Sequence, residues 1–259
     1  MPRPAASTSW ERVSRWYTTH LKQDDFLQRD VVIPGTLALL ADAAPGTHLD
    51  VACGEGSFAQ AFLQAFPRRA FVGVDAAPSL IRSAQLKQLP RTRFIVGDAQ
   101  RLPHLPEGTF SSATCLLAIQ NIADASAVFH EVATRLSPDA SLVIVMNHPY
   151  FRQPKQSSWG WDEERKIQYR RVDRYLESYK MEIVAHPGKQ PSITTASYHR
   201  SLGFYIQELA HQGFMIDALE EWTSPAQSDS GPRANAENIA RQEIPLFLAI
   251  RARLIRTIF

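Results

Sequence analysis

The sequence predicts an α/β fold built on a parallel sheet that helices cover on both faces. Through the middle of the chain, short runs of apolar residues alternate with helical patterns. Runs that are apolar throughout and alternate with helices are typical of strands buried in a parallel sheet. These runs also end in polar residues, and ligand sites of open α/β sheets lie beyond the carboxyl ends of the strands. The pattern therefore predicts both the fold class and the sheet edge that carries the site.

Length and composition set the broad class of the protein. The 259 residues fit one large α/β domain with a substantial core. The 28 Lys and Arg against 26 Asp and Glu give a net charge of +2, which offers no global reason to bind nucleic acid or an anionic membrane. Two cysteines, Cys53 and Cys115, argue against a disulfide framework and favour a reducing compartment. With no apolar stretch typical of a signal peptide or membrane span, we expect a cytoplasmic protein.

Residues 1–43 are predicted to form a helical cover. Their aromatic and apolar side chains recur at three- and four-residue spacing, as in Trp10, Val13, Trp16 and Tyr17. A leucine-rich segment follows Pro34-Gly35. We expect this cover, with Trp16 and Tyr17, to close over the site.

Residues 44–150 are predicted to form the core of the sheet. The expected strands are 48–52, 71–75, 93–96, 113–119 and 142–146. The expected helices are 57–66, 79–87 and 123–136. The strands end in polar groups at Asp50, Asp75, Asp98, Gln120-Asn121 and Asn147-His148. Because parallel strands bring their carboxyl ends to one edge, we expect these groups to lie close together.

The last third of the chain is predicted to hold an insertion and then a return to the sheet. Residues 151–196 break the alternation and are interpreted as a lid over the substrate. Ser197 is predicted to cap a helix that runs to Gly213. Strands are expected at 214–222 and 244–251, with a loop between them, so that residues 197–259 complete a single domain.

A glycine turn follows the first predicted strand. In the segment 48–58, a strand ends, Gly54 and Gly56 allow unusual backbone angles, and a helix begins. Gly54-x-Gly56-x-x-Ala59 also satisfies the dinucleotide pattern, so an NAD- or FAD-dependent oxidoreductase is an alternative. Asp50, four residues before Gly54, would repel a pyrophosphate and attract an ammonium or sulfonium group. The acid therefore favours a cationic ligand without phosphates.

The blocks LDVACGEGSF, FVGVDAAPSLIRSA, VGDAQRLP and CLLAIQNIAD resemble those of class I S-adenosylmethionine-dependent methyltransferases, in particular the small-molecule branch often called methyltransferase type 11. The resemblance covers roughly residues 46–147, with a family-like helix and strand pair at 197–255. It implies a Rossmann-like, seven-stranded, mostly parallel sheet with an antiparallel C-terminal strand pair. It also implies S-adenosylmethionine as cofactor and S-adenosylhomocysteine as product.

The resemblance implies cofactor-binding roles for residues of the turn and the strand ends. Asp50 would lie near the methionine end, Asp75 would bind the ribose hydroxyls, and Asp98 would meet the adenine amino group. The complete set is Asp50, Ala52, Gly54, Gly56, Asp75, Ala76, Asp98, Ala99, Ile119, Gln120 and, from the cover, Tyr17. Of these, Ile119 and Gln120 would flank the path of the methyl group.

Methyl transfer is an in-line displacement in which positioning of the nucleophile supplies much of the catalysis. A general base is needed only when the nucleophile carries a proton that it does not lose readily at neutral pH. Neutral histidine is the usual base, and His148 and His199 stand at suitable places in the chain. We expect no metal site.

Residues 151–180 hold eight basic residues, five acids and six aromatics. Such a segment suits a lid that binds a small acceptor, aromatic or anionic, methylated on oxygen or nitrogen. The predicted acceptor-binding residues are Tyr150, Trp159, Trp161, Arg170, Tyr198 and Arg200. The same composition suits a homodimer interface through residues 151–185, in which the segment 175–184 pairs as a strand between subunits.

Three functional alternatives remain at this point. The first is an RNA or protein methyltransferase, favoured by the basic and aromatic residues of the segment 151–180 but lacking a recognisable RNA-binding module. The second is the NAD- or FAD-dependent oxidoreductase that the glycine pattern allows. The third is a cofactor-binding protein without transfer activity.

Overall fold

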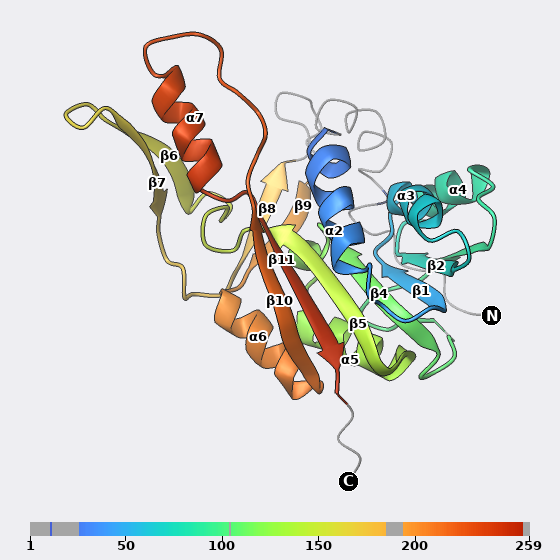
Figure 1. Ribbon diagram of the computed structural model, residues 1–259. Coiled ribbons are helices and arrows are strands. Elements are labelled where there is room, and N and C mark those ends of the chain that lie inside the picture. Colours follow the sequence, from blue (N-terminus) through green and yellow to red (C-terminus); the bar gives the residue numbers. More distant parts are fainter. Residues whose placement is uncertain (1–10, 12–25, 104, 185–193, 256–259) are drawn as a thin grey trace.

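The computed structural model describes residues 11, 26–103, 105–184 and 194–255. One seven-stranded sheet forms its centre, in the order β10-β11-β5-β4-β1-β2-β3 (Figure 1). Its strands are β1 (Thr47–Val51), β2 (Ala70–Asp75), β3 (Thr92–Val96), β4 (Phe110–Leu116), β5 (Leu136–Asn147), β10 (Phe214–Trp222) and β11 (Phe247–Leu254). The first five run parallel, and β11 is antiparallel to both of its neighbours. The predicted α/β fold with an antiparallel C-terminal strand pair is confirmed.

Helices cover both faces of the sheet, as the apolar strands require (Figure 1). One face carries α2 (Ile33–Leu39), which follows the π-helical turn η1 (Gln28–Val32), together with α3 (Ser57–Ala65) and α4 (Pro78–Leu86). The other face carries α5 (Ala125–Arg135) and α6 (Leu202–His211). A short 3₁₀ turn, η2 (Ile119–Asn121), connects β4 to α5.

Two apolar cores lie between the sheet and these helix layers. Successive residues of β1 show the alternation: Leu49 packs in the core beneath α5 and α6, whereas the His48 ring stacks on Phe62 of α3 with the ring centres 4.4 Å apart. The sheet and its helices thus form a rigid support for the loops at the carboxyl ends of the strands, since buried elements of this kind are the most stable part of a domain.

The inserted segment forms two hairpins outside the central sheet. One hairpin pairs β6 (Ser157–Asp162) with β7 (Ile167–Val172), and the other pairs β8 (Tyr179–Val184) with β9 (Thr194–His199). The helix start predicted at Ser197 is wrong, because Ser197 lies inside β9 and the predicted segment boundary at 196/197 divides that strand. The helix begins at Leu202, where the Ser201 hydroxyl accepts a hydrogen bond from the Phe204 N–H at 3.3 Å.

An additional helix, α7 (Ala234–Glu243), begins at the end of the loop predicted between the last two strands, and the sequence pattern predicted no helix there. Only Ala240 of this helix is buried, and the helix therefore lacks the apolar periodicity from which a helix is predicted. It lies beside the β6–β7 hairpin, where Arg233 pairs with Glu163 at 2.8 Å and stacks on the Trp161 ring at 4.6 Å (Figure 1). This hairpin, which we call the arm, is therefore held against α7. None of the helices described is long and apolar enough to cross a membrane.

Candidate active site

The glycine turn joins β1 to α3 in a backbone path that glycine favours. Gly54 and Gly56 have φ of +56° and +74°, and Gly56 is the residue that precedes α3. A Cβ on Gly56 would lie 3.0 Å from the Phe94 ring, so that Gly56 permits close packing of the turn. A Cβ on Gly54 would meet nothing within 4 Å, because Gly54 faces an open cavity.

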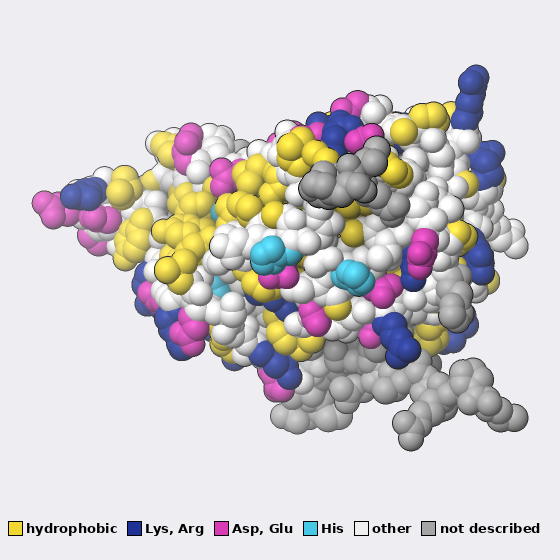
Figure 2. Space-filling view, turned by 90° about the horizontal axis from the view of Figure 1, so that it is seen from below, with side chains coloured by type: hydrophobic (Ala, Val, Ile, Leu, Met, Phe, Trp, Pro, Cys, Tyr) yellow, Lys and Arg dark blue, Asp and Glu magenta, His cyan; other side chains and the backbone are white. Residues whose placement is uncertain are grey.

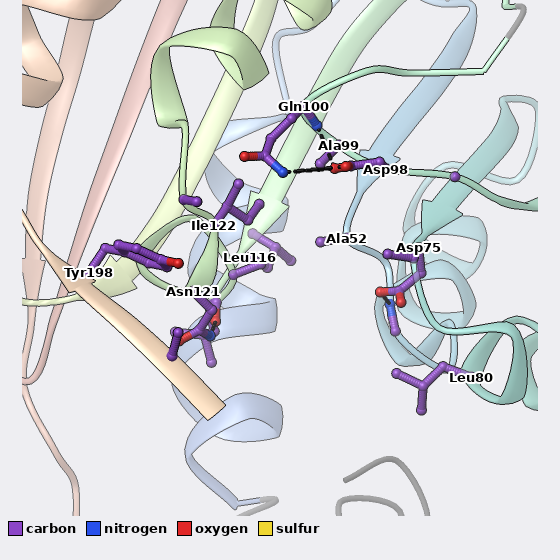
Figure 3. A pocket seen from close by; sticks show the side chains of 17 residues that line it. Ala52, Asp75, Leu80, Asp98, Ala99, Gln100, Leu116, Asn121, Ile122 and Tyr198 are labelled. Carbon is purple, nitrogen blue, oxygen red and sulfur yellow. Dashed lines mark hydrogen bonds between the residues drawn. The ribbon is translucent and has the colours of Figure 1, made fainter. Parts of the chain in front are cut away.

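This cavity, which we call the strand-end cavity, has a volume of about 300 Å³. It lies at the carboxyl ends of β1, β2 and β4, where the alternation of strands and helices predicts the site (Figure 3). Its lining residues are Ala52, Gly54, Asp75, Ala76, Leu80, Gly97, Asp98, Ala99, Gln100, Leu116, Leu117, Ala118, Asn121, Ile122, Ala123, Ala196 and Tyr198. Six of the residues expected to bind the cofactor are among them: Ala52, Gly54, Asp75, Ala76, Asp98 and Ala99.

Two carboxylates face the strand-end cavity. Asp75 accepts hydrogen bonds from the backbone N–H groups of Gly54 and Ala77, both at 2.9 Å. Burial raises the pKa of Asp75, and the two N–H groups act in the opposite direction. Asp98 is exposed and accepts from the Gln100 N–H at 2.9 Å (Figure 3). The two side chains thus lie on one side of the cavity, and Tyr198 of β9 lies on the other.

The chemistry of this lining fits S-adenosylmethionine. Each oxygen of the Asp75 carboxylate has a second lone pair that can accept from a ribose hydroxyl. Leu80, Leu116 and Ile122 supply apolar walls for a purine. No Lys or Arg is among the described lining residues, so that the cavity offers carboxylates to a cation and no guanidinium or ammonium group to a pyrophosphate. The lining thereby disfavours the dinucleotide alternative.

Asp50 lies behind the glycine turn and does not line the cavity. Its side chain is 2% exposed and accepts a hydrogen bond from the Thr114 hydroxyl at 2.7 Å. That hydroxyl lies 2.9 Å from His48 Nε2, and His48 Nδ1 lies 2.8 Å from the Ser112 hydroxyl. Sequence reasoning missed this chain of polar groups, although His48 and Asp50 share one face of β1 by the two-residue period of a strand.

Burial sets the charges along this chain. Burial raises the pKa of Asp50 to about 7, with a further contribution from Asp75, whereas Thr114 acts in the opposite direction. Burial lowers the pKa of His48 to about 3, aided by Arg69, so that the imidazole is neutral. A neutral imidazole has one donor and one acceptor nitrogen. Because the Thr114 hydroxyl donates to Asp50, His48 Nε2–H donates to Thr114 and His48 Nδ1 accepts from the Ser112 hydroxyl.

The other residues expected to bind the cofactor lie elsewhere. Ile119 is fully buried in the core beneath α5, and Gly56 packs against Phe94. Gln120 faces a second cavity. Tyr17 and Trp16 of the predicted cover lie outside the described residues.

The second cavity, which we call the hairpin cavity, has a volume of about 440 Å³. It adjoins the strand-end cavity, and the two share Leu117, Asn121 and Tyr198 as lining residues. The remaining lining residues are Leu27, Gln28, Gln120, Asn147, Pro149, Arg152, Pro154, Ile183, Ser197, His199, Arg200, Tyr205, Leu246 and Phe247. From the inserted segment, the hairpin β8–β9 and the stretch that contains Arg152 and Pro154 line this cavity, whereas the arm does not.

The two histidines considered as bases are placed differently. His148 is 4% exposed; its Nε2 lies 2.7 Å from the Glu221 carboxylate, and its Nδ1 accepts from the Tyr150 N–H at 3.2 Å. Both nitrogens are thus engaged away from the cavities. His199 lines the hairpin cavity, and its Nε2–H donates to the Tyr175 carbonyl at 2.7 Å. Burial lowers the pKa of His199, so that its Nδ1 keeps an unprotonated lone pair at neutral pH.

Of the residues expected to bind the acceptor, some line the hairpin cavity and others lie away from it. Tyr198 and Arg200 line the hairpin cavity. Trp159 and Trp161 belong to the arm, and Arg170 bonds to the Phe151 carbonyl at 2.8 Å; none of these three lines either cavity. Tyr150 is 42% exposed and packs edge-on against Tyr175. No three His, Cys, Asp or Glu side chains among the described residues are grouped as a metal site requires.

Comparison with known proteins finds a family match in the core of the chain. Residues 49–139 match the family model described as a methyltransferase domain. An uncharacterised protein of Haemophilus influenzae is 26% identical over 230 residues, which are 86% of both chains. A demethylmenaquinone methyltransferase of Deinococcus radiodurans is 36% identical over 39% of this chain and 43% of that protein. A trans-aconitate 2-methyltransferase of an Acidovorax strain is 29% identical over 48% of this chain and 50% of that protein.

Solved structures extend the likeness over most of the chain. An S-adenosylmethionine-dependent methyltransferase from Mesorhizobium loti superposes with a TM-score of 0.67 and 24% identity, over 85% of this chain and 96% of that one. This likeness concerns the fold. The chain aligns with half or less of the length of the two named enzymes. The segment that matches the family model contains the glycine turn and the acidic strand ends.

Proposed function

The chain carries a class I S-adenosylmethionine-dependent methyltransferase domain, and we propose that it transfers a methyl group to a small-molecule acceptor, on oxygen or nitrogen. The observation that carries the proposal is the pair of adjoining cavities that share Leu117, Asn121 and Tyr198. The strand-end cavity fits the cofactor, and the hairpin cavity adjoins it at these shared residues. An acceptor in the hairpin cavity would therefore face the methyl group.

The chain's own residues would hold the cofactor at the strand-end cavity. Asp75 would accept from the ribose hydroxyls, because its two backbone partners fix the carboxylate in one orientation. Asp98 would accept from the adenine amino group between the walls formed by Leu80 and Ile122. Burial raises the pKa of Asp50 to about 7, and the ammonium end of the cofactor, near the turn, would favour the ionised form of this side chain and be stabilised by it. The chemistry that S-adenosylmethionine supplies when bound is a methyl group already activated by a sulfonium.

On the acceptor side the chain would position the nucleophile and remove a proton where the nucleophile carries one. His199 suits this role because the Tyr175 carbonyl binds its Nε2–H and leaves Nδ1 as the acceptor nitrogen. Its ring is held against that of Tyr179 with centres 4.9 Å apart, so that the imidazole keeps its orientation. His148 is not part of the proposal, since Glu221 and a backbone N–H occupy its nitrogens.

The size of the site favours a small acceptor over RNA or protein. The hairpin cavity is about 440 Å³, within the range of small-molecule pockets. Two relatives are enzymes named for small acceptors, demethylmenaquinone and trans-aconitate, which supports the proposal. The even balance of charge and the two free thiols, Cys53 and Cys115, favour the cytoplasm as the place of the reaction.

A homodimer through residues 151–185 remains part of the proposal. Exposed apolar side chains on this segment support it, with Leu176 at 82% and Tyr169 at 46% exposure. Figure 2 shows hydrophobic side chains gathered toward the side of the molecule that carries the arm. The strand expected to pair between subunits, β8, is paired with β9 of the same chain, so that the arm is the better candidate for the contact. Light scattering after gel filtration tests the dimer, and a monomer at all concentrations would contradict it.

Calorimetry and a transfer assay test the proposed function. We expect S-adenosylhomocysteine to bind and NAD and FAD to give no heat. In the transfer assay, tritium from [methyl-³H]S-adenosylmethionine should enter a small-molecule extract of cells. Label that enters only RNA or protein from the same cells would favour the macromolecular alternative. Binding without label in any acceptor would favour the non-catalytic one.

A further inference from the structure

The hairpin cavity holds positive charge that no acidic side chain balances. Arg152 and Arg200 line it, and none of its described lining residues is Asp or Glu. Neither guanidinium has a carboxylate within ion-pair distance among the described residues, although arginines elsewhere, such as Arg251 and Arg253, pair with Asp42 and Asp217. A partly buried charge without a partner is costly, so that the absence of a protein carboxylate here suggests a ligand that supplies one.

Arg152 is held at the cavity without being neutralised. Its Nε is buried and has no hydrogen-bond partner among the described residues. The Trp159 ring lies 5.4 Å from its guanidinium carbon, and Arg170 contacts the same ring from 5.1 Å. Burial, aided by the charge of Arg170, lowers the pKa of Arg152 to about 10, so that the side chain stays protonated at neutral pH. The ring and the neighbouring cation therefore orient Arg152 and leave its donors available.

Arg200 offers a second guanidinium from another element. It is 6% exposed, and its Nη2 donates to the Ile122 and Ala123 carbonyls at 2.9 and 2.5 Å. Its Nη1 is buried and has no partner in the described part of the chain. The two carbonyl bonds fix the plane of this side chain, since guanidinium donors have a rigid arrangement. The Arg200 guanidinium is thus fixed at the wall of the cavity, close to Tyr205, which lines the same cavity.

The hairpin cavity also has an uncharged polar side chain, Gln120, in its lining. Gln120 donates its Nε2 to the Leu117 carbonyl at 2.8 Å, which fixes the amide and leaves its buried Oε1 without a donor. An acceptor with an O–H or N–H group would satisfy this oxygen, as a nucleophile on oxygen or nitrogen does. The cavity therefore presents guanidinium donors and one fixed amide acceptor.

We propose that the acceptor carries an oxyanion, a carboxylate or a phosphate group, which binds Arg152 and Arg200 in the hairpin cavity. The inference rests on the proposed function, because it assigns this cavity to the acceptor. Planar guanidinium groups bind both oxyanions through paired hydrogen bonds, which are stronger than bonds between neutral groups. The acceptor is therefore an organic acid or a phosphate ester rather than a neutral or cationic molecule.

Fractionation of a cell extract by charge tests this class of acceptor. The extract, freed of macromolecules, is separated by ion exchange into anionic, neutral and cationic fractions, and each is incubated with the full chain and [methyl-³H]S-adenosylmethionine. We expect label from the anionic fraction. Label from the neutral or cationic fraction alone would overturn the oxyanion proposal and leave the proposed function intact. No label from any fraction, in protein that binds S-adenosylhomocysteine, would overturn the proposed function itself.

Phosphatase treatment of the anionic fraction separates the two sources of an oxyanion. If the acceptor is a phosphate monoester, treatment removes its ability to accept label. If it is a carboxylic acid, labelling persists after treatment. Labelling that persists after treatment and is lost after chemical amidation of carboxylates would identify the acid directly. Labelling that survives both treatments would contradict the proposal.

Variants of Arg152 test its proposed role in binding the acceptor. For the active fraction, Arg152→Gln should lower the transfer rate at limiting acceptor by about 10- to 100-fold, the range expected when a charged hydrogen bond is removed. Arg152→Lys, which keeps the charge, should recover part of the rate. The matched control is Arg171→Gln on the arm, where Arg171 pairs with Asp173 at 2.8 Å. Affinity for S-adenosylhomocysteine reports folding and should be unchanged in all three; equal rates in Arg152→Gln and the control would overturn the assignment.

Discussion

The two cavities carry opposite charges although they share a wall. The strand-end cavity is lined by Asp75 and Asp98 and by no described Lys or Arg, whereas the hairpin cavity is lined by Arg152 and Arg200 and by no described Asp or Glu. Such a contrast suits a cationic cofactor on one side and an anionic acceptor on the other. It also keeps each ligand from the other's cavity, because the wrong charge would be repelled.

The cavities also differ in how the chain builds them. The strand-end cavity is built mainly from loops that directly follow β1, β2, β3 and β4. The hairpin cavity combines residues from the start of the described chain, from the loops after β4 and β5, from β8 and β9, and from the segment before β11. The edge of the sheet thus supports the strand-end cavity. The hairpin cavity depends on connecting segments whose sequence can vary without disturbing the sheet.

The largest expected effect concerns catalysis at the hairpin cavity. With an O–H or N–H acceptor, His199→Gln should lower kcat by about 100- to 10,000-fold, the usual contribution of a general base. The affinity for S-adenosylhomocysteine should be unchanged, because His199 does not line the strand-end cavity. Steady-state kinetics with calorimetry measures both.

His148 provides the control for that experiment. His148→Gln should lower the unfolding temperature, since it removes a buried ring bonded to Glu221, and should leave kcat of the folded protein unchanged. A loss of kcat in His148→Gln without one in His199→Gln would reverse the assignment of the base.

A smaller effect is expected at the strand-end cavity. Asp75→Asn should weaken S-adenosylhomocysteine binding by about 100-fold, because it removes charge from bonds to the ribose and to the turn. Asp98→Asn should weaken it less, since Asp98 is exposed and its bonds compete with water. Calorimetry measures both dissociation constants. An equal loss in the two variants would contradict the placement of the ribose at Asp75.

The buried chain beneath the turn predicts a pH dependence of stability. Asp50, with a pKa raised to about 7, contributes stability that is present at low pH and is lost as pH rises through 7. His48, with a pKa lowered to about 3, stabilises the fold above its unfolded pKa, and this contribution is lost as pH falls toward 3. Between about pH 4 and 6.5 the contribution of Asp50 to the free energy of unfolding falls with pH and that of His48 rises, so that the two changes cancel.

Replacement of Asp50 should reveal the pH dependence of stability that His48 contributes. In Asp50→Asn the free energy of unfolding should rise with pH between about 4 and 6.5 by up to about 1.4 kcal/mol per unit relative to wild type, because the proton that folded Asp50 retains no longer offsets the proton that folded His48 lacks. Urea unfolding at several pH values measures this slope. Parallel pH profiles for the variant and the wild type would show that the two groups do not titrate as described.

The strand-end cavity could be predicted from the sequence because its determinants are local. A glycine turn after a buried strand and an acid at each following strand end are visible in short segments, and the parallel sheet brings them to one edge. Asp50 was placed at the right turn, but its burial depends on Thr114, which is 64 residues away. The sequence pattern therefore predicted the edge and missed the chain of polar groups behind it.

The hairpin cavity could be predicted only in part, through Tyr198, His199 and Arg200, because its other residues join them only in the folded chain. Within the basic segment 151–180, nothing local distinguishes Arg152 from Arg165 or Arg171, and Trp159 was expected to contact the acceptor. Residues 194–199 resemble a loop and a helix cap, since polar side chains rather than large apolar ones occupy the buried positions of β9. The error at Ser197 and the omission of Arg152 have this common origin.

A crystal structure with S-adenosylhomocysteine bound tests the central claim most directly, namely that the two cavities divide the cationic cofactor and the anionic acceptor between them. We expect the ribose at Asp75, the adenine near Asp98, and the sulfur directed past Leu117 and Tyr198 toward Arg152. A sulfur atom directed away from the hairpin cavity, or a cofactor that itself occupies the space beside Arg152, would contradict it.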